Sequence, residues 1–231
     1  MKDIQRTSSW RTLTPWQGSL WPVLVVLVGG MLVPQSGVAG KYNKVLSVGE
    51  TGPAWTDLPG TDGAEHSLQD LADKPVVVVA FTCLSCPTAL DYEPRINELA
   101  RKYGGESGQV AFIVICVNRI EADRLPALSA HVEEQNLQFA FLHDESQQIA
   151  RDYGAIYTPQ FFVLNQDRKI TYMGALDDAT EADQVTRSYL DEAIRATLEG
   201  ATPEIEETVP RGCTIRYQRD RQRRRVKSEA D

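Results

Sequence analysis

The sequence predicts an α/β domain in which helices cover both faces of a central mixed sheet. Two short apolar runs rich in β-branched residues, 76–81 and 110–117, are typical of strands buried on both faces. Segments with helical periodicity alternate with these runs along the chain. Two further strands, 161–164 and 169–173, are separated by a short turn, which favours an antiparallel hairpin at the end of the domain.

The other elements complete the order β-α-β-α-β-α-β-β-α, which is typical of such a layered domain. Apolar residues recur at spacings of three and four from Ala89 to Tyr103, so these side chains share one face of a helix. Asp144 is placed to cap a later helix, which Gly154 ends. The predicted elements are a helix over 89–103, a helix over 121–135, a short strand over 139–142, a helix from 144 to 153 and a final helix over about 181–198.

A pair of cysteines lies where the first buried strand ends and the first helix begins. Cys83 and Cys86 are separated by two residues, and Pro87 follows them. The free N–H groups and the dipole of a first helical turn stabilise a thiolate, which lowers its pKa and activates it as a nucleophile. We expect Cys83 to be the exposed attacking thiol and Cys86, one turn further in, to resolve the mixed disulfide. The alternatives are a structural disulfide or half of a metal site.

Residues 1–39 have the pattern of an export signal. A positively charged start precedes an apolar stretch over 20–33, and small residues follow at 37–39. The apolar stretch is short and interrupted for a membrane span, and an uncleaved amino-terminal anchor is the alternative interpretation. In both cases the rest of the chain is expected to be exported to the periplasm or another extracytoplasmic compartment, where disulfides persist. We expect one folded redox domain over 40–201.

The carboxyl-terminal tail, residues 202–231, is first acidic and then strongly basic. Runs of like charge are usually solvated, so we expect this tail to be partly disordered. Gly212 lets the chain turn sharply, and Ile215 offers an apolar anchor for docking. Docking would bring Cys213 towards the dithiol as a candidate third redox thiol. A free or structural cysteine in a loosely docked tail is the alternative.

Composition limits the classes of partner. The 231-residue chain carries a formal net charge of −8, which argues against a nucleic-acid partner. A membrane partner is expected only if the amino-terminal signal stays uncleaved. Dithiol exchange needs neither a metal nor an organic cofactor, so we expect no cofactor. The expected partners are protein thiols and disulfides, together with a redox partner that the sequence does not identify.

The dithiol, the order of elements and the pair Thr158-Pro159 resemble the thioredoxin-like superfamily, and most closely its redoxin branch of alkyl hydroperoxide reductase/thiol-specific antioxidant-like proteins. The resemblance spans residues 50–200 and implies a three-layer α/β/α sandwich, with 118–153 as the insertion typical of redoxins. It also implies that Pro159 is cis and faces the dithiol. The backbone of Thr158 is then expected to pair with a substrate strand.

The residues around the cysteines depart from two members of that superfamily. Thr82 and the dipeptide Leu84-Ser85 stand where thioredoxin has Trp and Gly-Pro, so the resemblance leaves the direction of electron transfer open. The threonine that positions a peroxide in redoxin-type peroxidases is missing, because Ala80 stands three residues before Cys83. We therefore predict an exported thiol–disulfide oxidoreductase. A redoxin-type peroxidase and a metal-binding or structural module are the alternatives.

Overall fold

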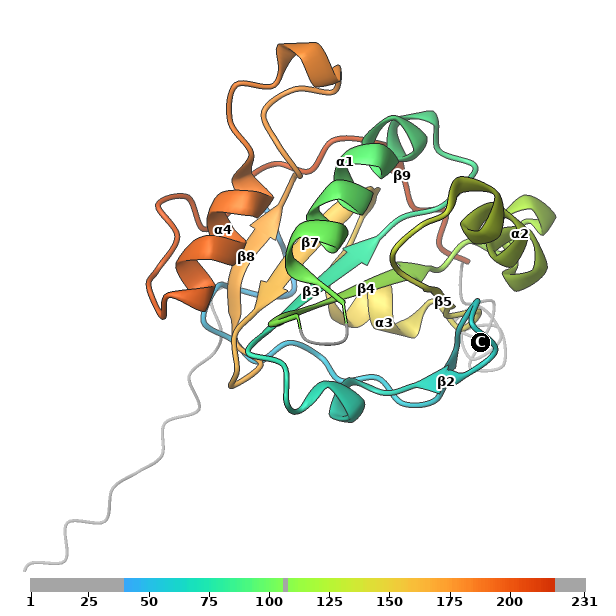
Figure 1. Ribbon diagram of the computed structural model, residues 1–231, viewed down its shortest axis with the longest axis horizontal. Helices are drawn as coiled ribbons and strands as arrows, with labels where there is room; N and C mark the ends of the chain where they lie inside the picture. Colours follow the sequence, from blue (N-terminus) through green and yellow to red (C-terminus); the bar gives the residue numbers. More distant parts are fainter. Residues whose placement is uncertain (1–39, 106–107, 219–231) are drawn as a thin grey trace, which may run out of the picture. The chain divides into compact units, whose positions relative to one another are not determined.

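The computed structural model describes residues 40–105 and 108–218. A five-stranded mixed sheet in this part of the chain has the strand order β5-β4-β3-β7-β8 (Figure 1). Neighbours β3, β4 and β5 are parallel, whereas β7 is antiparallel to both β3 and β8. The strands are β3 (Val76–Phe81), β4 (Val110–Cys116), β5 (Phe141–His143), β7 (Gln160–Leu164) and β8 (Ile170–Gly174). The predicted mixed sheet with a terminal hairpin is confirmed.

The central strand β3 owes its position to its composition. All six of its residues are buried, and alternate side chains enter two separate apolar clusters on opposite faces of the sheet. Val78 and Ala80 belong to one cluster, and Val79 and Phe81 belong to the other. A strand with apolar side chains on both faces needs a covering layer on each side, because both faces must be removed from water.

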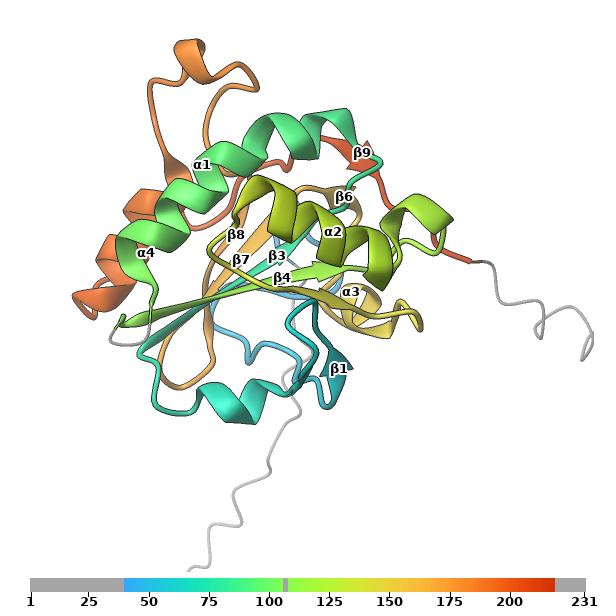
Figure 2. The same ribbon diagram turned by 45° about the vertical axis from the view of Figure 1, so that its right-hand side comes forward.

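Helices supply those two layers. Residues of α1, α2 and α4 pack into one cluster, whereas α3 and the short 3₁₀ helix η1 contribute to the other (Figure 2). The helices are α1 (Pro87–Tyr103), α2 (Leu125–Gln135), α3 (Gln148–Asp152), α4 (Tyr189–Leu198) and η1 (Leu68–Leu71). This arrangement is the predicted three-layer α/β/α sandwich of the thioredoxin-like fold.

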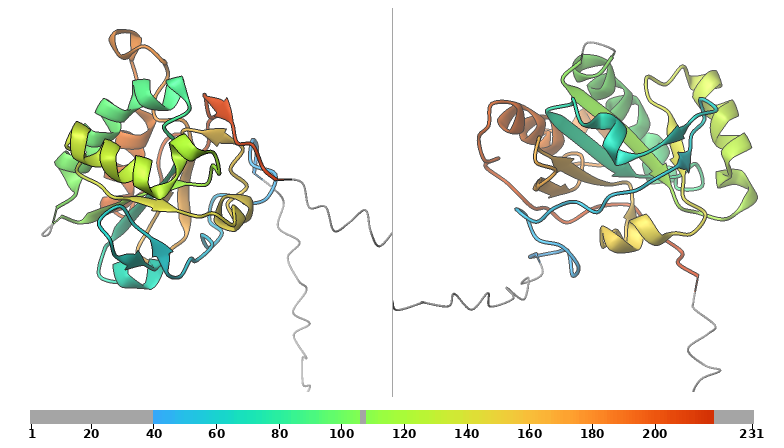
Figure 3. Two further views of the ribbon diagram at one scale, coloured as in Figure 1. Left: turned by 90° about the vertical axis from the view of Figure 1, so that its right-hand side faces the viewer. Right: turned by 90° about the horizontal axis from the view of Figure 1, so that it is seen from below.

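Irregular segments cover the rest of the sheet. The lead-in before β3, blue and cyan in Figure 3, runs along the face away from α1. Its residues Trp55 and Leu68 belong to the apolar cluster on that face. Within it, β1 (Leu58–Pro59) and β2 (Glu65–His66) form a small antiparallel pair beside β5. At the opposite edge, the backbone of Met173 in β8 bonds to Glu206 and Thr208. Both edges of the sheet are therefore shielded from pairing with another chain.

The last helix begins later than the sequence predicts. A 3₁₀ turn, η3 (Ala182–Gln184), and an extended segment precede α4, which starts at Tyr189 rather than near Glu181. Asp178 explains the difference, because its carboxylate accepts hydrogen bonds from the N–H groups of Thr186 (3.0 Å) and Arg187 (3.1 Å) and from the Thr186 hydroxyl. Side-chain bonds of this kind compete with helix formation.

Two predictions concern segments beyond the described residues. The export signal over 1–39 and most of the basic run, from 219 onward, lie outside them. Residues 202–218 of the predicted tail are described, and they pack against the domain through buried residues that include Pro203 and Ile215. Within the described ranges, no helix is both long enough and apolar enough to cross a membrane.

Candidate active site

The two cysteines of the C-x-x-C motif lie between the end of β3 and the start of α1. Cys86 is the N-cap residue of α1, and Pro87 takes the first helical position, where its missing N–H costs nothing. Cys83 is only 3% exposed and Cys86 only 1%. The prediction of an exposed Cys83 is therefore wrong. Thr158 and C-terminal residues that line the same pocket surround this thiol, and the sequence pattern around the motif does not reveal them.

Thr158 lies against both sulfurs. Its hydroxyl Oγ1 is 3.5 Å from Cys83 Sγ, and its backbone carbonyl accepts a hydrogen bond from Cys86 Sγ at 3.0 Å. The Thr158–Pro159 peptide bond is cis, as the resemblance implies. The structure therefore brings together the dithiol and the Thr158-Pro159 pair, which lie more than seventy residues apart in the sequence.

The loop between the cysteines is held by a carboxylate that the sequence does not single out. Asp123, in the 3₁₀ helix η2 (Glu121–Asp123), is fully buried and accepts hydrogen bonds from the N–H groups of Leu84 and Ser85, both at 2.9 Å. The Ser85 hydroxyl donates to the same carboxylate at 2.5 Å, and the Asn118 amide donates to it at 2.9 Å. These four bonds fix the backbone that positions Cys83 Sγ.

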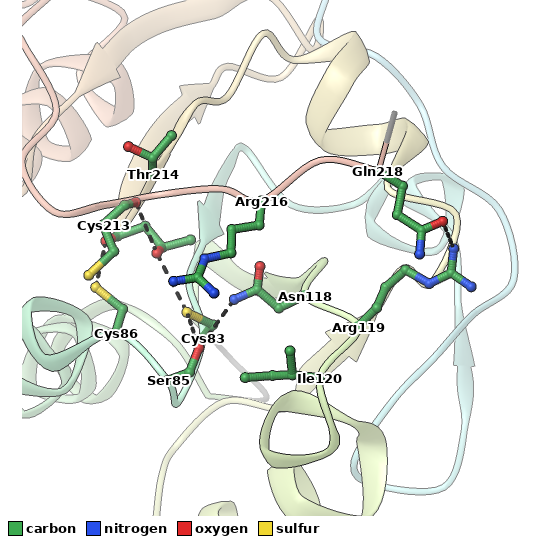
Figure 4. A pocket seen from close by; sticks show the side chains of 11 residues that line it. Cys83, Ser85, Cys86, Asn118, Arg119, Ile120, Cys213, Thr214, Arg216 and Gln218 are labelled. Atoms are coloured by element: carbon green, nitrogen blue, oxygen red, sulfur yellow. Dashed lines mark hydrogen bonds between the residues drawn. The ribbon is translucent and has the colours of Figure 1, made fainter. Parts of the chain in front are cut away.

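The dithiol opens on a pocket of about 800 Å³. Figure 4 shows side chains of the motif, of the loop after β4 and of the C-terminal residues around it, and Thr158 also lines it. The lining includes Cys83, Cys86, Asn118, Thr158, Cys213 and Arg216. Both sulfurs and Thr158 therefore line one space.

The environments of the two sulfurs favour different charge states. Burial raises the pKa of Cys83; hydrogen bonds with Thr158 and Ser85 oppose this rise, and the negative charge of Asp123 adds to it. Burial alone would also raise the pKa of Cys86, but hydrogen bonds from the thiol of Cys213 and from nearby backbone N–H groups lower it below its ordinary value. The thiolate stabilised at the helix start is therefore Cys86, whereas the sequence predicts Cys83.

Cys213 reaches the site from the C-terminal segment. Strand β9 (Cys213–Thr214) pairs antiparallel with β6 (Tyr157–Thr158), and Cys213 is the register partner of Thr158. Figure 4 shows its sulfur pointing towards that of Cys86, so the two thiols share one environment. Interaction with the Cys86 side chain, together with burial, raises the pKa of Cys213 to about 11. The expected approach of Cys213 to the dithiol is observed, and its nearest redox neighbour is Cys86.

The fourth cysteine is remote from exchange chemistry. Cys116 is fully buried in β4, as predicted, and burial strongly raises its pKa. Its thiol donates to the backbone carbonyl of Asp123 at 3.5 Å. Across 40–105 and 108–218, no three His, Cys, Asp or Glu side chains are arranged to hold a metal ion.

Comparison with known proteins places this geometry in a family. The family model described as Redoxin matches residues 47–194. No curated protein matches the sequence. A hypothetical protein from Sinorhizobium meliloti 1021 shares 26% identity at a TM-score of 0.70, over 76% of this chain and 97% of its own. An uncharacterized conserved protein from Geobacillus kaustophilus shares 27% identity at 0.69, over 76% of this chain and 95% of its own.

A more distant neighbour supports the fold alone. A putative protein disulfide isomerase from Bacteroides thetaiotaomicron shares 21% identity at a TM-score of 0.54, over 68% of this chain and 94% of its own. The family match covers the central sheet, the dithiol and Thr158-Pro159. This chain belongs to the Redoxin family and has a thioredoxin-like fold.

Proposed function

We propose that this protein is an exported thiol–disulfide oxidoreductase that works through Cys83 and Cys86. One observation carries the proposal. Both sulfurs lie at the amino-terminal end of α1, both contact Thr158, and both line the same pocket of about 800 Å³. A dithiol at a helix start, beside a backbone edge that can bind an extended chain, has the parts that disulfide exchange requires.

Reduction of a substrate disulfide takes two exchange steps. The Cys83 thiolate attacks one substrate sulfur, the substrate S–S bond breaks, and the other sulfur leaves as a thiolate that takes up a proton. The Cys86 thiolate then attacks Cys83 Sγ and releases the second substrate thiol. Two electrons pass from the dithiol to the substrate, and a Cys83–Cys86 disulfide remains. Oxidation of a substrate dithiol runs through the same steps in reverse.

The lowered pKa of Cys86 supports its part in both directions. In the reductive direction, the lowered pKa lets Cys86 form its thiolate more readily, and this thiolate attacks the mixed disulfide. In the oxidative direction, the same stabilised thiolate is a good leaving group when a substrate attacks Cys83. Cys83 then carries the mixed disulfide, and its thiolate forms once substrate binding displaces the groups that bury it.

The substrate class follows from the edge of β6. Thr158 lies in a strand whose edge pairs with an antiparallel segment, β9, and an extended peptide can bind to a sheet edge in the same way. We therefore propose that the substrates are cysteine-containing protein segments in an extended conformation. Export is the second part of the proposal, and it rests on the charged, apolar and small-residue pattern over 1–39.

Substitution of each cysteine tests the proposed reaction. Cys83→Ser abolishes turnover of a disulfide substrate such as insulin, and Cys86→Ser accumulates covalent complexes with its partners because the mixed disulfide is not resolved. Cys116→Ala is the matched control, since that thiol lies outside the pocket, and it keeps wild-type turnover. Wild-type turnover in Cys83→Ser would refute the proposal.

Two further measurements separate the alternatives. We expect the protein to consume hydroperoxide no faster than free cysteine does, because the threonine that positions a peroxide is missing before Cys83. A rate far above that of free cysteine would identify a redoxin-type peroxidase instead. Amino-terminal sequencing of the protein recovered from its own cells tests export. Cleavage after Ala39 is the expected result, and an intact amino terminus in the cytoplasmic fraction would contradict it.

A further inference from the structure

The chain's own C-terminal segment, residues 206–218, occupies the edge that the proposed function assigns to substrates. Within it, β9 pairs antiparallel with β6, so that Cys213 lies opposite Thr158 and Thr214 lies opposite Tyr157. This is the arrangement in which an extended substrate would add to the edge. The segment therefore stands where a substrate strand is expected, with a cysteine at the position next to the dithiol.

The segment is anchored on both sides of Cys213. Before it, Thr208 N–H donates to the carbonyl of Met173 in β8 at 3.1 Å. After it, the backbone N–H of Ile215 donates to Ile156 at 2.9 Å, and the Ile215 side chain is buried. Anchors on either side restrict where Cys213 can move, so its position beside the dithiol is built into the fold.

Gly212 permits the close approach of the two strands. Its φ of +150° lies in the region that favours glycine, and a Cβ there would come within 2.0 Å of the Thr158 carbonyl oxygen. The clash would be with backbone rather than with a flexible side chain. No other residue fits this position without moving β9 away from β6.

The sulfur of Cys213 shares the start of α1 with Cys86. Figure 4 shows the two sulfurs pointing towards each other, and Cys213 lies against the start of α1, where Cys86 is the N-cap residue. Free N–H groups at a helix start stabilise negative charge on either sulfur. Cys213 is also partly exposed, whereas Cys83 and Cys86 are buried, so it is the thiol of the three that solvent reaches most easily.

We propose that residues 206–218 act as an internal substrate, in which Cys213 exchanges with the oxidised dithiol to form a Cys86–Cys213 disulfide. The proposal rests on the proposed function, because it needs the Cys83–Cys86 disulfide as its starting state. It goes beyond that function because it assigns the edge of β6 to a segment of the chain itself, β9. External substrates must then displace β9, and the disulfide fixes β9 in place.

The exchange is balanced without another reactant. The Cys213 thiolate attacks Cys86 Sγ, a Cys86–Cys213 bond forms, the Cys83–Cys86 bond breaks, and Cys83 leaves as a thiolate. The proton lost by Cys213 returns to Cys83, whose buried site favours the thiol. No electrons are gained or lost overall. The hydrogen bond to a Cys86 thiolate, which raises the pKa of Cys213, is absent in the starting disulfide.

Disulfide mapping tests the proposal. Wild-type protein and Cys83→Ser are equilibrated in a glutathione redox buffer, quenched with acid, alkylated and analysed by peptide mass spectrometry. We expect a Cys86–Cys213 linkage beside Cys83–Cys86 in the wild type, and as the main linkage in Cys83→Ser. Absence of the Cys86–Cys213 linkage from both proteins overturns the proposal.

A pair of glycine variants tests the placement of β9. Gly212→Ala is expected to lose the Cys86–Cys213 linkage, to keep Cys83–Cys86, and to lower the KM for a peptide disulfide several-fold because the edge is open. Gly200→Ala is the matched control, since it also has a positive φ but no atom within 4 Å of the added Cβ. It keeps both linkages, as does the wild type.

The outcomes of the two proposals are distinguishable. If Gly212→Ala forms Cys86–Cys213 as readily as the wild type, the internal-substrate proposal is wrong even though turnover continues. If Cys83→Ser turns over insulin at the wild-type rate, the proposed function fails, whatever linkages are mapped. Loss of the Cys86–Cys213 linkage in Gly212→Ala, together with its lower KM, supports the internal substrate.

Discussion

The carboxylate of Asp123 accepts a hydrogen bond from the backbone N–H of Leu84 at 2.9 Å, across 39 residues of sequence. The same oxygen accepts the N–H of Ser85, also at 2.9 Å, so a single buried charge holds both residues between the cysteines. A charge buried this deeply is stable only when donors surround it, and here backbone and side-chain donors do so. The carboxylate thereby both orders the loop and places negative charge near Cys83.

Replacing this carboxylate is expected to change the acidity of Cys83. Burial is the main cause of its raised pKa, and the charge of Asp123 adds to that rise. Asp123→Asn removes the charge but keeps an acceptor for the loop N–H groups, so the pKa of Cys83 falls. The ultraviolet absorbance of the thiolate, titrated in a Cys86→Ala, Cys213→Ala background, measures this shift.

The control for that titration lies on the same 3₁₀ turn. Glu121 has an 89% exposed side chain paired with Arg124, and Glu121→Gln is expected to leave the Cys83 titration unchanged. Asp123→Ala, which removes the acceptors as well, is expected to destabilise the protein by about 2 kcal/mol, the scale of hydrogen bonds to a charged group. A Cys83 pKa that stays constant or rises in Asp123→Asn would show that the charge does not act on this thiol.

The contribution of Asp123 shows where sequence reasoning stops. The apolar run before Cys83 and the helical spacing after Cys86 are local signals, and they predict the sheet, the helix and the dithiol between them. Nothing local marks Asp123, because its role arises only when the segment after β4 folds over the start of α1. Asn118, which bonds to it, is hidden for the same reason.

Two errors in the sequence predictions have the same physical origin. The pattern around the motif predicts an exposed, acidic Cys83, but the fold surrounds Cys83 with Thr158 and Asp123 and gives the stabilising donors to Cys86. The helix predicted from residue 181 is displaced by hydrogen bonds to Asp178. In both cases contacts within the folded chain override a local preference for charge or helix.

If Cys213 acts on Cys86, replacing Cys213 is expected to change the pKa of the Cys86 thiol, which a purely structural residue would not do. Burial would raise the pKa of Cys86, and the Cys213 thiol is the foremost of the hydrogen bonds that lower it. In a Cys83→Ala background, adding Cys213→Ala removes this donor, so Cys86 ionises at higher pH. Adding Cys213→Ser keeps an O–H donor and is expected to keep most of the lowered pKa.

Thiolate absorbance against pH measures that difference directly, because the strongly raised pKa of Cys116 keeps its thiol from titrating in the same range. The serine variant retains the hydrogen bond but cannot form a disulfide, so it separates acidity from redox exchange. Equal pKa values for Cys86 in the alanine and serine variants would mean that the helix start alone stabilises the thiolate.

A buried ion pair predicts a large stability loss away from the dithiol. Arg95 in α1 pairs with Asp177, whose side chain is 2% exposed, and also donates to the carbonyl of Thr180 at 2.6 Å. Arg95→Ala leaves the Asp177 carboxylate buried without its cation, which typically costs about 3 kcal/mol or more. Urea denaturation of the purified protein measures the free energy of unfolding.

An exposed ion pair on the same helix serves as the comparison. Lys102 pairs with Asp191 at 2.7 Å, but its side chain is 51% exposed, so Lys102→Ala is expected to cost less than about 1 kcal/mol. A similar loss in the two variants would indicate that burial of the Arg95–Asp177 pair adds nothing to its contribution.

The loop before α4 is expected to open in acid. The Thr186 hydroxyl and the N–H groups of Arg187 and Thr186 lower the pKa of Asp178 from 3.8 to about 2. Because the folded-state pKa is the lower one, the stabilisation is complete above about pH 3.8 and is lost as the pH falls through about 2.

Asp178→Ala removes these bonds at every pH, so the Thr186 and Arg187 amides exchange with deuterium faster even at neutral pH. Asp183→Ala, in the exposed part of the same loop, leaves their exchange unchanged. Equal protection in both variants would show that Asp178 does not hold the loop.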